Sequence, residues 1–371
     1  LVLYLIENKI SFSYKAKQYE GVTFTLKKTT PLFTHQISAL DQWNQNNKIG
    51  TICLPTGSGK TLIAVLAIEQ TKRPAMICVP TIDLMQQWYQ TLSEYFENPI
   101  GLIGGGYHEP AYLTVITYDS ARLYAESLGN RYGLLICDES HHLPSEYNQV
   151  IADAMIAPYR LGLTATPERQ DGKESILYEL IGPIVYRGEI TEMSGSVLAD
   201  YEVVSLEVAM TNDEEERYKL SRNIYLSFLK KHRIYFQKPS DWNYFIRIAA
   251  RSTEGRTAFK AYLEQKQLAQ ASATKIHAVW DLICKHRGDR ILIFTQDNKM
   301  AYHIGKTFLL PVITHHTKTK ERKKFLDYFR NGTFCCLVTS KVLNEGVDVP
   351  DANIGIVVSG SGSVREHVQM L

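Results

Sequence analysis

The chain has 371 residues, 44% of them hydrophobic, and a formal net charge of +2. This length allows two or three domains with sizeable cores. The nearly neutral charge excludes a global basic field, so any nucleic-acid site must be a local patch. Apolar runs stay shorter than the roughly 18 residues that a membrane span requires, and we expect neither a signal peptide nor a membrane segment. The sequence begins with Leu, and we expect it to be a fragment of a longer protein.

Short apolar runs alternate with stretches of helical spacing in the first part of the chain. Predicted strands lie in IGTICLP, AMICVP, LTVITY, GLLICDE and RLGLTATP, and predicted helices cover Lys60–Gln70 and Asp83–Tyr95. This alternation indicates a parallel sheet covered on both faces. Residues 211–271 lack strand runs and are predicted to be helical, and strands return in RILIFTQ, FCCLVTS and NIGIVVSG. The fold class is therefore α/β, with two such domains and a helical insertion.

The cysteines favour a reducing, intracellular environment. Cys53, Cys78 and Cys137 lie in predicted buried strands, and Cys335 and Cys336 lie in another. Buried cysteine commonly behaves as a small hydrophobic residue, and the sequence has no Cys-x-x-Cys pair. We therefore expect free thiols and not disulfides.

A phosphate-binding loop follows the first predicted strand. The segment LPTGSGKT ends in Gly-x-Gly-Lys-Thr and opens an apolar helix, which is the context that the motif requires. Glycines let backbone N–H groups surround phosphate oxygens, and the helix N-terminus adds positive partial charge. Lys60 would reach the β- and γ-phosphates, and the Thr61 hydroxyl would bind Mg²⁺. The alternative is a glycine-rich turn before a helix. The predicted nucleotide-binding residues of the loop are Thr56, Gly57, Ser58, Gly59, Lys60 and Thr61.

The segment ICDESHHLP ends a second buried strand and completes this site. In phosphate-loop enzymes such a strand ends in an acid that holds Mg²⁺, and Asp138 has that position. Glu139 is placed to accept a proton from an attacking water. Zinc would need three or four protein ligands, and the sequence supplies neither these nor the four cysteines of an iron–sulfur site. We expect His141 to form a hydrogen bond at the sheet edge, with His142 packed beside it.

A series of motifs in this order resembles the superfamily 2 helicases. They are LPTGSGKT, CVPTIDLMQQW, VITYDSA, DESHH, LTATP, IFTQ and VTSKVLNEGVDVPDANIGIVVSGSGSVRE. The last block, with LGLTATPERQDGKESIL, looks like the XPB helicases, particularly the archaeal branch, and the resemblance begins at about Pro31. It implies two tandem RecA-like domains that bind ATP and Mg²⁺ between them. It also implies 3′-to-5′ movement on DNA, nucleotide excision repair or transcription as the process, and a nuclease partner.

The resemblance also implies roles for residues at matching positions. His141 would couple the nucleotide site to movement, and Gln369 would act in catalysis with Lys60, Asp138 and Glu139. The other matching positions are Gln36 for adenine, Thr164, Ala165 and Thr166 for linking hydrolysis to DNA movement, and Gly346 and Asp348 for contacts to nucleotide and nucleic acid.

Domain boundaries follow from the same resemblance. Residues 1–30 would be the tail of a damage-recognition domain, and residues 31–195 the first helicase domain. Residues 211–271 would form a thumb-like insertion that grips DNA. Segments 196–210 and 272–371 would form the second helicase domain, with its C-terminal part missing.

Two segments depart from the family pattern. XPB proteins carry Arg-Glu-Asp after the first domain's last strand, whereas this chain has Arg169, Gln170 and Asp171. The middle acid of an element assigned to duplex opening is thus replaced. The family's final motif runs Gln-Arg-x-Gly-Arg, whereas here Met370 follows the glutamine and the sequence ends at Leu371. We expect the arginines of this motif, worth about 10³–10⁵ in rate, to lie beyond the given sequence.

Predicted DNA contacts lie at strand ends and in the insertion. A motor must ignore base sequence, so contacts to the DNA backbone suit it. Hydroxyls and neighbouring N–H groups at strand ends can hold phosphates, and the alternative for each threonine is a cap of the strand end. In the insertion, FLKKHRIYFQK interleaves basic and aromatic residues, which permits phosphate contact and stacking; the alternative is an ordinary solvated helix face. The predicted DNA-binding residues are Thr81, Thr117, Tyr118, Arg169, Asp171, Lys230, Lys231, Arg233, Thr295 and Thr339.

Four functional interpretations compete. An XPB-type, DNA-dependent ATPase that acts on duplex, forked or bubble DNA explains all the motifs. A phosphate-loop kinase or small-molecule ATPase leaves LTATP and the second domain unexplained. Intact Lys60, Asp138 and Glu139 argue against a catalytically weak scaffold for other proteins. An RNA-directed or restriction-type motor stays open. We expect a cytoplasmic protein, associated with the nucleoid in an archaeon, or a nuclear one in a eukaryote.

Overall fold

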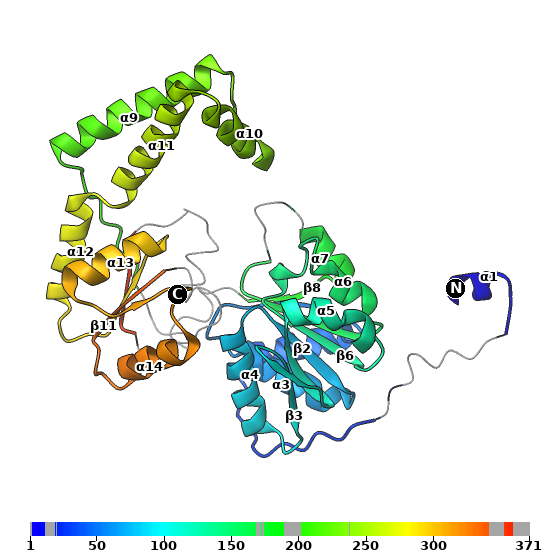
Figure 1. The fold of residues 1–371 in the computed structure, drawn as a ribbon. Coiled ribbons are helices and arrows are strands. Elements are labelled where there is room, and N and C mark those ends of the chain that lie inside the picture. Colours follow the sequence, from blue (N-terminus) through cyan, green and yellow to red (C-terminus); the bar gives the residue numbers. More distant parts are fainter. Residues whose placement is uncertain are drawn as a thin grey trace. The chain divides into compact units, whose positions relative to one another are not determined.

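The computed structural model describes residues 2–11, 19, 21–167, 172, 174–188, 202–236, 238–340 and 352–358. The chain divides into two compact units. Among the described residues, the first unit runs to Glu202 and the second begins at Val203. A short helix, α1 (Val2–Glu7), opens the chain (Figure 1).

The first unit is built on an eight-stranded sheet with strand order β4-β3-β5-β2-β6-β7-β1-β8. Neighbouring strands are parallel except β3 and β4, which form an antiparallel pair at one edge. The loops that follow β6, β7 and β1 therefore start side by side at the carboxyl edge of the sheet. The strands are β1 (Ile49–Cys53), β2 (Ala75–Val79), β3 (Ile100–Gly104), β4 (Tyr107–Glu109), β5 (Leu113–Thr117), β6 (Leu134–Asp138), β7 (Tyr159–Thr164) and β8 (Ile184–Arg187).

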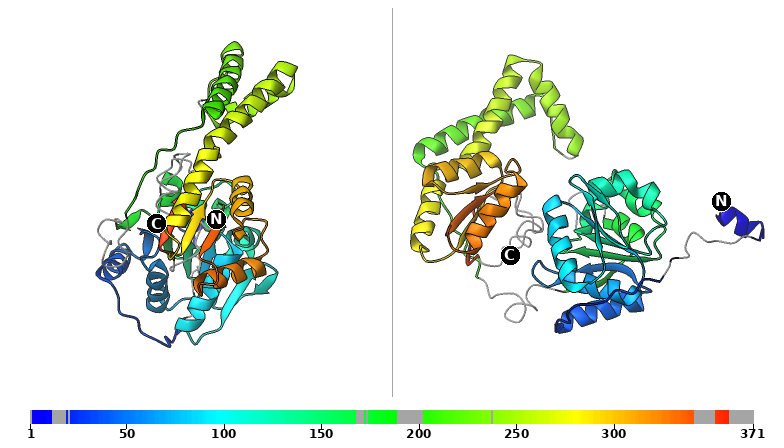
Figure 2. Two further views of the ribbon diagram at one scale, coloured as in Figure 1. Left: turned by 90° about the vertical axis from the view of Figure 1, so that its left-hand side faces the viewer. Right: turned by 60° about the horizontal axis from the view of Figure 1, so that its bottom comes forward.

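Helices cover both faces of this sheet (Figure 2). In β2, Ala75, Ile77 and Val79 join a core with α2, α3 and α4, whereas Met76 and Cys78 join a core with α5, α6 and α7. Because both faces are buried, the central strands appear in the sequence as continuous apolar runs. The helices are α2 (Thr34–Gln45), α3 (Lys60–Thr71), α4 (Ile82–Tyr95), α5 (Tyr118–Leu128), the short 3₁₀ helix η1 (Ser140–His142), α6 (Gln149–Ala154) and α7 (Glu174–Leu180).

The second unit contains a smaller, four-stranded parallel sheet with order β10-β11-β9-β12. Residues from β9, β11 and β12 form one core with helices α12 and α13. The elements are α12 (Ala273–Lys285), β9 (Ile291–Phe294), α13 (Asn298–Phe308), β10 (Val312–Ile313), α14 (Thr319–Arg330), β11 (Cys336–Thr339) and β12 (Ile354–Val357).

Three further helices of the second unit form the helical insertion: α9 (Asn212–Lys231), α10 (Pro239–Ala250) and α11 (Thr253–Gln270). Helices α9 and α11 pack along each other (Figures 1 and 2), and Phe228 and Phe245 centre a small aromatic core. Both ends of the insertion are tied together at its base. The Ala273 N–H donates to the Glu214 carboxylate at 2.8 Å, and the Thr274 hydroxyl donates to the Ala209 carbonyl at 2.6 Å.

The predicted fold class is confirmed: two tandem RecA-like parallel-sheet domains with a helical insertion. The sequence interpretation omits β3, β4, β8 and β10. Glycines interrupt β3, β4 and β10 are very short, and β8 directly follows a proline. Burial of Cys53, Cys78 and Cys137 is confirmed, but the same expectation for Cys335 is wrong, because β11 begins only at Cys336 and Cys335 is exposed. The described part of the chain holds no helix long and apolar enough to cross a membrane.

Candidate active site

The phosphate loop joins β1 to α3 in a conformation that requires glycine. Gly57 and Gly59 have φ angles of 79° and 81°, in the left-handed region where a side chain is strained. A Cβ atom on Gly59 would also overlap the side-chain amide of Gln36. Both glycines of the motif are thus explained by backbone geometry as well as by access for phosphate.

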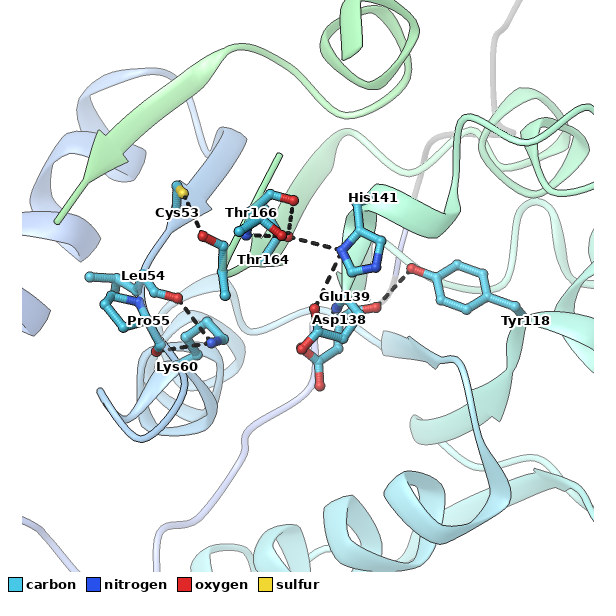
Figure 3. A network of polar contacts seen from close by, with 11 residues as sticks. Cys53, Leu54, Pro55, Lys60, Tyr118, Asp138, Glu139, His141, Thr164 and Thr166 are labelled. Atoms are coloured by element: carbon cyan, nitrogen blue, oxygen red, sulfur yellow. Dashed lines mark hydrogen bonds and ion pairs between the residues drawn. The ribbon is translucent and has the colours of Figure 1, made fainter. Parts of the chain in front are cut away.

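Lys60 opens α3, and its side chain turns back into the loop. The Nζ atom donates to the Leu54 and Pro55 carbonyl oxygens, each at 3.0 Å (Figure 3). The same ammonium group acts electrostatically on the carboxyl of Asp138. The predicted phosphate lysine therefore lies close enough to the predicted metal-binding acid for its charge to oppose the rise that burial causes in the pKa of that acid.

Gln36 lies against the loop, with only 2% of its surface exposed. Its Nε2 donates to the Ser58 carbonyl at 3.1 Å, and its Oε1 accepts from the Phe33 N–H at 3.1 Å. The His35 ring also lies 2.9 Å from the Ser58 oxygen. The amide therefore holds the loop in this state, and reading of adenine by Gln36 stays a prediction.

Asp138 ends β6 in a buried position, 7% exposed. Its Oδ1 accepts from the Glu139 N–H at 2.9 Å, and its Oδ2 accepts from the Trp88 indole N–H at 2.7 Å. Burial raises the pKa of this carboxyl, while the indole N–H, the Lys60 charge and the backbone N–H oppose that rise. These donors favour the ionised form that a metal ion needs.

Glu139, His141 and Thr164 form a buried polar chain across the ends of β6 and β7 (Figure 3). His141 Nδ1 lies 3.4 Å from Glu139 Oε2 and 3.1 Å from the Thr164 hydroxyl. The Thr164 hydroxyl in turn donates to the Thr166 carbonyl at 3.1 Å and accepts from the Thr166 N–H at 3.2 Å. The predicted base therefore lies within ion-pair distance of His141, and His141 is hydrogen-bonded to the predicted coupling segment.

Glu139 itself adopts a left-handed backbone, with φ 46° and ψ 50°. For a residue with a side chain, this conformation costs on the order of 1–2 kcal/mol. It turns the chain directly after the strand, so Asp138 reaches toward α4 while Glu139 reaches His141. Adjacent acids thereby have different partners.

Mg²⁺ would find suitable donors at this edge of the sheet. It prefers hard oxygen ligands in octahedral arrangement, and the Asp138 carboxylate and the Thr61 hydroxyl at the start of α3 are of that kind. The residues present therefore fit a magnesium ion held together with nucleotide phosphates.

Two residues at this site were not assigned to it from the sequence. Trp88 belongs to the quoted motif CVPTIDLMQQW, but that pattern alone does not show where the indole lies. Tyr118 is 4% exposed and its hydroxyl donates to the Asp138 carbonyl oxygen at 2.9 Å. Burial of Tyr118 conflicts with the predicted DNA contact of its side chain.

The threonines predicted to hold DNA use their hydroxyls within the protein. Thr81 caps α4 by accepting from the Leu84 N–H, and Thr117 caps α5 by accepting from the Ser120 N–H. Thr295 donates to the Asp297 and Thr339 carbonyls, and Thr339 donates to the Ser340 carbonyl. Each hydroxyl thus has a partner within the protein, and contact of these threonines with DNA phosphates stays a prediction.

The basic residues of the insertion lie at the exposed end of α9. Lys230 and Arg233 are exposed, whereas Lys231 Nζ is paired with the Glu254 carboxylate at 2.7 Å. Nearby, Tyr235 is 70% exposed and Phe236 45% exposed. Arg169, Asp171, Gly346, Asp348 and Gln369, which carry other predicted contacts, lie outside the described residues.

Comparisons with known proteins agree with this geometry. The family ResIII, described as the res subunit of type III restriction enzymes, matches residues 29–169, and the helicase conserved C-terminal domain matches residues 274–371. The chain is 42% identical over 346 residues to the "DNA 3'-5' translocase XPB2" of Sulfurisphaera tokodaii, an alignment that covers 93% of this chain and 79% of that protein. The chain belongs to the XPB family.

More distant XPB relatives are longer. The chain is 26% identical to the "General transcription and DNA repair factor IIH helicase/translocase subunit XPB/SSL2" of Saccharomyces cerevisiae, over 93% of this chain and 39% of that protein. It spans about half the length of several prokaryotic XPB and Rad25 relatives. The Hef helicase domain of Pyrococcus furiosus shares the fold, with a TM-score of 0.56, 19% identity and 92% of both chains covered.

Proposed function

We propose that this protein hydrolyses ATP in order to move 3′ to 5′ along DNA and open duplexes, forks or bubbles during nucleotide excision repair or transcription. The observation that carries the proposal is the gathering of the predicted catalytic groups at one sheet edge. The Lys60 charge opposes the rise that burial causes in the pKa of Asp138, and Glu139 is joined through His141 to Thr164. The names of the XPB relatives support DNA as the track and the direction of movement.

Each residue of the site has one task in this proposal. Backbone N–H groups of the loop and the Lys60 ammonium bind the phosphates. Glu139 accepts the proton of the attacking water, and His141 holds the Glu139 carboxylate in place. Asp138 and Thr61 would hold Mg²⁺, which when bound supplies positive charge that neutralises the phosphate oxygens.

Coupling to movement runs through the same contacts. A change in the charge or position of Glu139 reaches Thr164 through one imidazole ring, and Thr164 is bonded twice to Thr166. The segment after β7 would therefore sense whether hydrolysis has occurred. Nucleic acid held by that segment and by the insertion would move in response.

ATPase assays on the full-length protein with single-stranded, duplex and forked DNA and with RNA test the proposal. We expect DNA to stimulate hydrolysis, with Lys60→Ala as a variant that binds nucleotide weakly and turns it over little. Lys28→Ala is a matched control. Lys28 is also a lysine, but it forms an exposed ion pair with Glu94 and is not part of the phosphate loop. Equal rates with and without every nucleic acid would contradict the proposal.

A restriction-type or RNA-directed motor is the second candidate. The match of residues 29–169 to the res subunit family is the observation that favours it. Stimulation by RNA alone would select the RNA-directed motor, and dependence on a specific duplex sequence would select the restriction type. A nuclease partner belongs to the primary proposal through family resemblance, and co-purification of the full-length protein with a nuclease would test it.

A further inference from the structure

Trp88 makes a contact whose role the proposed function does not assign. Its indole lies in the core between α4 and the first sheet, 2% exposed. A buried indole N–H needs an acceptor, and a nearby backbone carbonyl would serve. Here the acceptor is the Oδ2 atom of Asp138, at 2.7 Å. A distance this short to a carboxylate is typical of a charge-assisted hydrogen bond.

The Asp138 carboxylate is held from both sides. Oδ2 accepts from Trp88 on α4, and Oδ1 accepts from the Glu139 N–H at 2.9 Å. Rotation of the carboxylate about its own axis would lengthen both hydrogen bonds. The Glu139 N–H belongs to the backbone directly after β6, whereas the Trp88 indole is carried by α4. The position of α4 therefore sets the direction in which the remaining lone pairs of the Asp138 carboxylate point.

Helix α4 joins this contact to the loop that follows β2. Thr81 caps its start, where the neighbouring Ile82 is 43% exposed. Trp88 lies seven residues after Thr81, about 10 Å along the axis at the usual rise per residue. Leu84, Met85 and Leu92 are buried on the same helix. A displacement of the start of α4 would therefore carry Trp88 with it.

We propose that Trp88 is a positioning residue: it orients Asp138 for the metal ion and transmits to that carboxylate a displacement of α4 when DNA contacts the loop around Thr81. The second half of this inference rests on the proposed function, because it needs DNA to bind at that loop. The first half does not need DNA.

A pair of matched variants tests the first half. Trp88→Phe keeps most of the packed ring and removes the N–H. Trp43→Phe does the same to another fully buried indole of the same core, whose N–H donates to the Arg160 carbonyl at 2.9 Å. Binding of a fluorescent ATP analogue is measured at graded Mg²⁺ concentrations, with thermal melting as a check on folding. Loss of a hydrogen-bonding partner behind a metal ligand typically weakens metal binding 10–100-fold.

We expect the Mg²⁺ concentration that gives half-maximal nucleotide binding to be about 10-fold higher for Trp88→Phe than for the wild type. For Trp43→Phe this concentration should equal that of the wild type. Equal Mg²⁺ requirements for Trp88→Phe and the wild type would overturn the positioning role. An equal increase in both variants would also overturn it, because the cause would then be general loosening of the core.

Indole N–H resonances of the wild-type protein provide a second test if Trp88→Phe does not fold. Paramagnetic Mn²⁺ with nucleotide replaces Mg²⁺, and we expect one indole signal to broaden at far lower Mn²⁺ than the others. The Trp43→Phe spectrum must retain that signal. Similar broadening of every indole, or loss of the sensitive signal in Trp43→Phe, would overturn the inference.

DNA stimulation tests the second half. The ratio of ATPase rates with and without DNA should fall toward one in Trp88→Phe and stay at the wild-type value in Trp43→Phe. A full ratio in Trp88→Phe, together with its raised Mg²⁺ requirement, would overturn the link through α4. A wild-type protein that shows no stimulation would instead refute the proposed function, so the two failures are distinguishable.

Discussion

The two parallel sheets differ in how the polar residues at their carboxyl edges use their side chains. In the first sheet, Glu139, His141 and Thr164 contact one another side chain to side chain. In the second sheet, the Thr295 hydroxyl donates to the Asp297 and Thr339 carbonyls at 3.0 and 3.1 Å. Side chains that bond to backbone tie strand ends together, whereas ionisable side chains that bond to one another can accept protons and respond to bound charge.

The same difference appears in burial. Asp138 and Glu139 are 7% and 5% exposed, although burial of a carboxylate is costly, whereas the buried polar side chains of the second unit's described residues are uncharged. Among the described residues, the buried carboxylates are Asp138 and Glu139, both at the carboxyl edge of the first sheet. Among the described residues, the buried ionisable groups that could take part in chemistry therefore lie in the first unit, whereas the insertion of the second unit exposes Lys230 and Arg233.

The largest expected effect concerns the first sheet edge. Glu139→Gln removes the proton acceptor and keeps the shape, so hydrolysis should fall at least about 10²-fold while nucleotide binding is retained. Phosphate release and binding of a fluorescent ATP analogue measure the two quantities. Glu97→Gln, at an exposed carboxylate of the same unit, is the control. Turnover close to the wild-type rate would break the assignment of chemistry to this edge.

An intermediate effect is expected in the insertion. If Lys230 contacts a DNA phosphate, Lys230→Ala should weaken binding and make the slope of log affinity against log salt less steep by about one. Lys219→Ala removes an exposed lysine of the same helix that is paired with Glu215, and should leave that slope unchanged. Fluorescence anisotropy with labelled DNA at several salt concentrations measures both. Identical slopes for all three proteins would remove Lys230 from the DNA surface.

The smallest effect concerns the packing of α9 on α11. The Arg217 guanidinium, followed by the Ser221 hydroxyl, lowers the pKa of Glu264 from its ordinary value of 4.5. A lowered pKa stabilises the fold above the ordinary value, and that contribution is lost as the pH falls through the lowered value. Glu264→Gln should therefore lower Tm at pH 7 by at most about 2 °C; the difference should start to shrink below pH 4.5 and vanish only once the pH is below the lowered pKa of Glu264. A difference that grows on acidification would contradict this account.

The sequence predicts those parts of the site that depend on local pattern. The loop from Thr56 to Thr61 and the acid after a buried strand can both be found because each sits at the junction of a strand with a turn. Strand β3 escapes prediction because glycines dilute its apolar pattern, and β10 because two residues carry no periodicity.

Contacts between distant segments could not be predicted. The hydrogen bond between Trp88 and Asp138 spans 50 positions, and it depends on how α4 is rotated over the sheet. The Tyr118 hydroxyl and the Gln36 amide likewise find partners that only the tertiary packing supplies. Threonines at strand ends illustrate the same limit. A threonine that caps a helix or strand and a threonine that binds a phosphate have the same pattern in the sequence.

The left-handed backbone at Glu139 sets stability against activity at one position. Asparagine and glycine adopt that conformation at less cost than glutamate, so selection for heat resistance alone would favour them. Either replacement would delete the carboxylate. The same substitution would therefore raise the melting temperature and abolish turnover. Variants selected for thermostability without an activity screen would therefore include proteins that are stably folded but do not hydrolyse ATP.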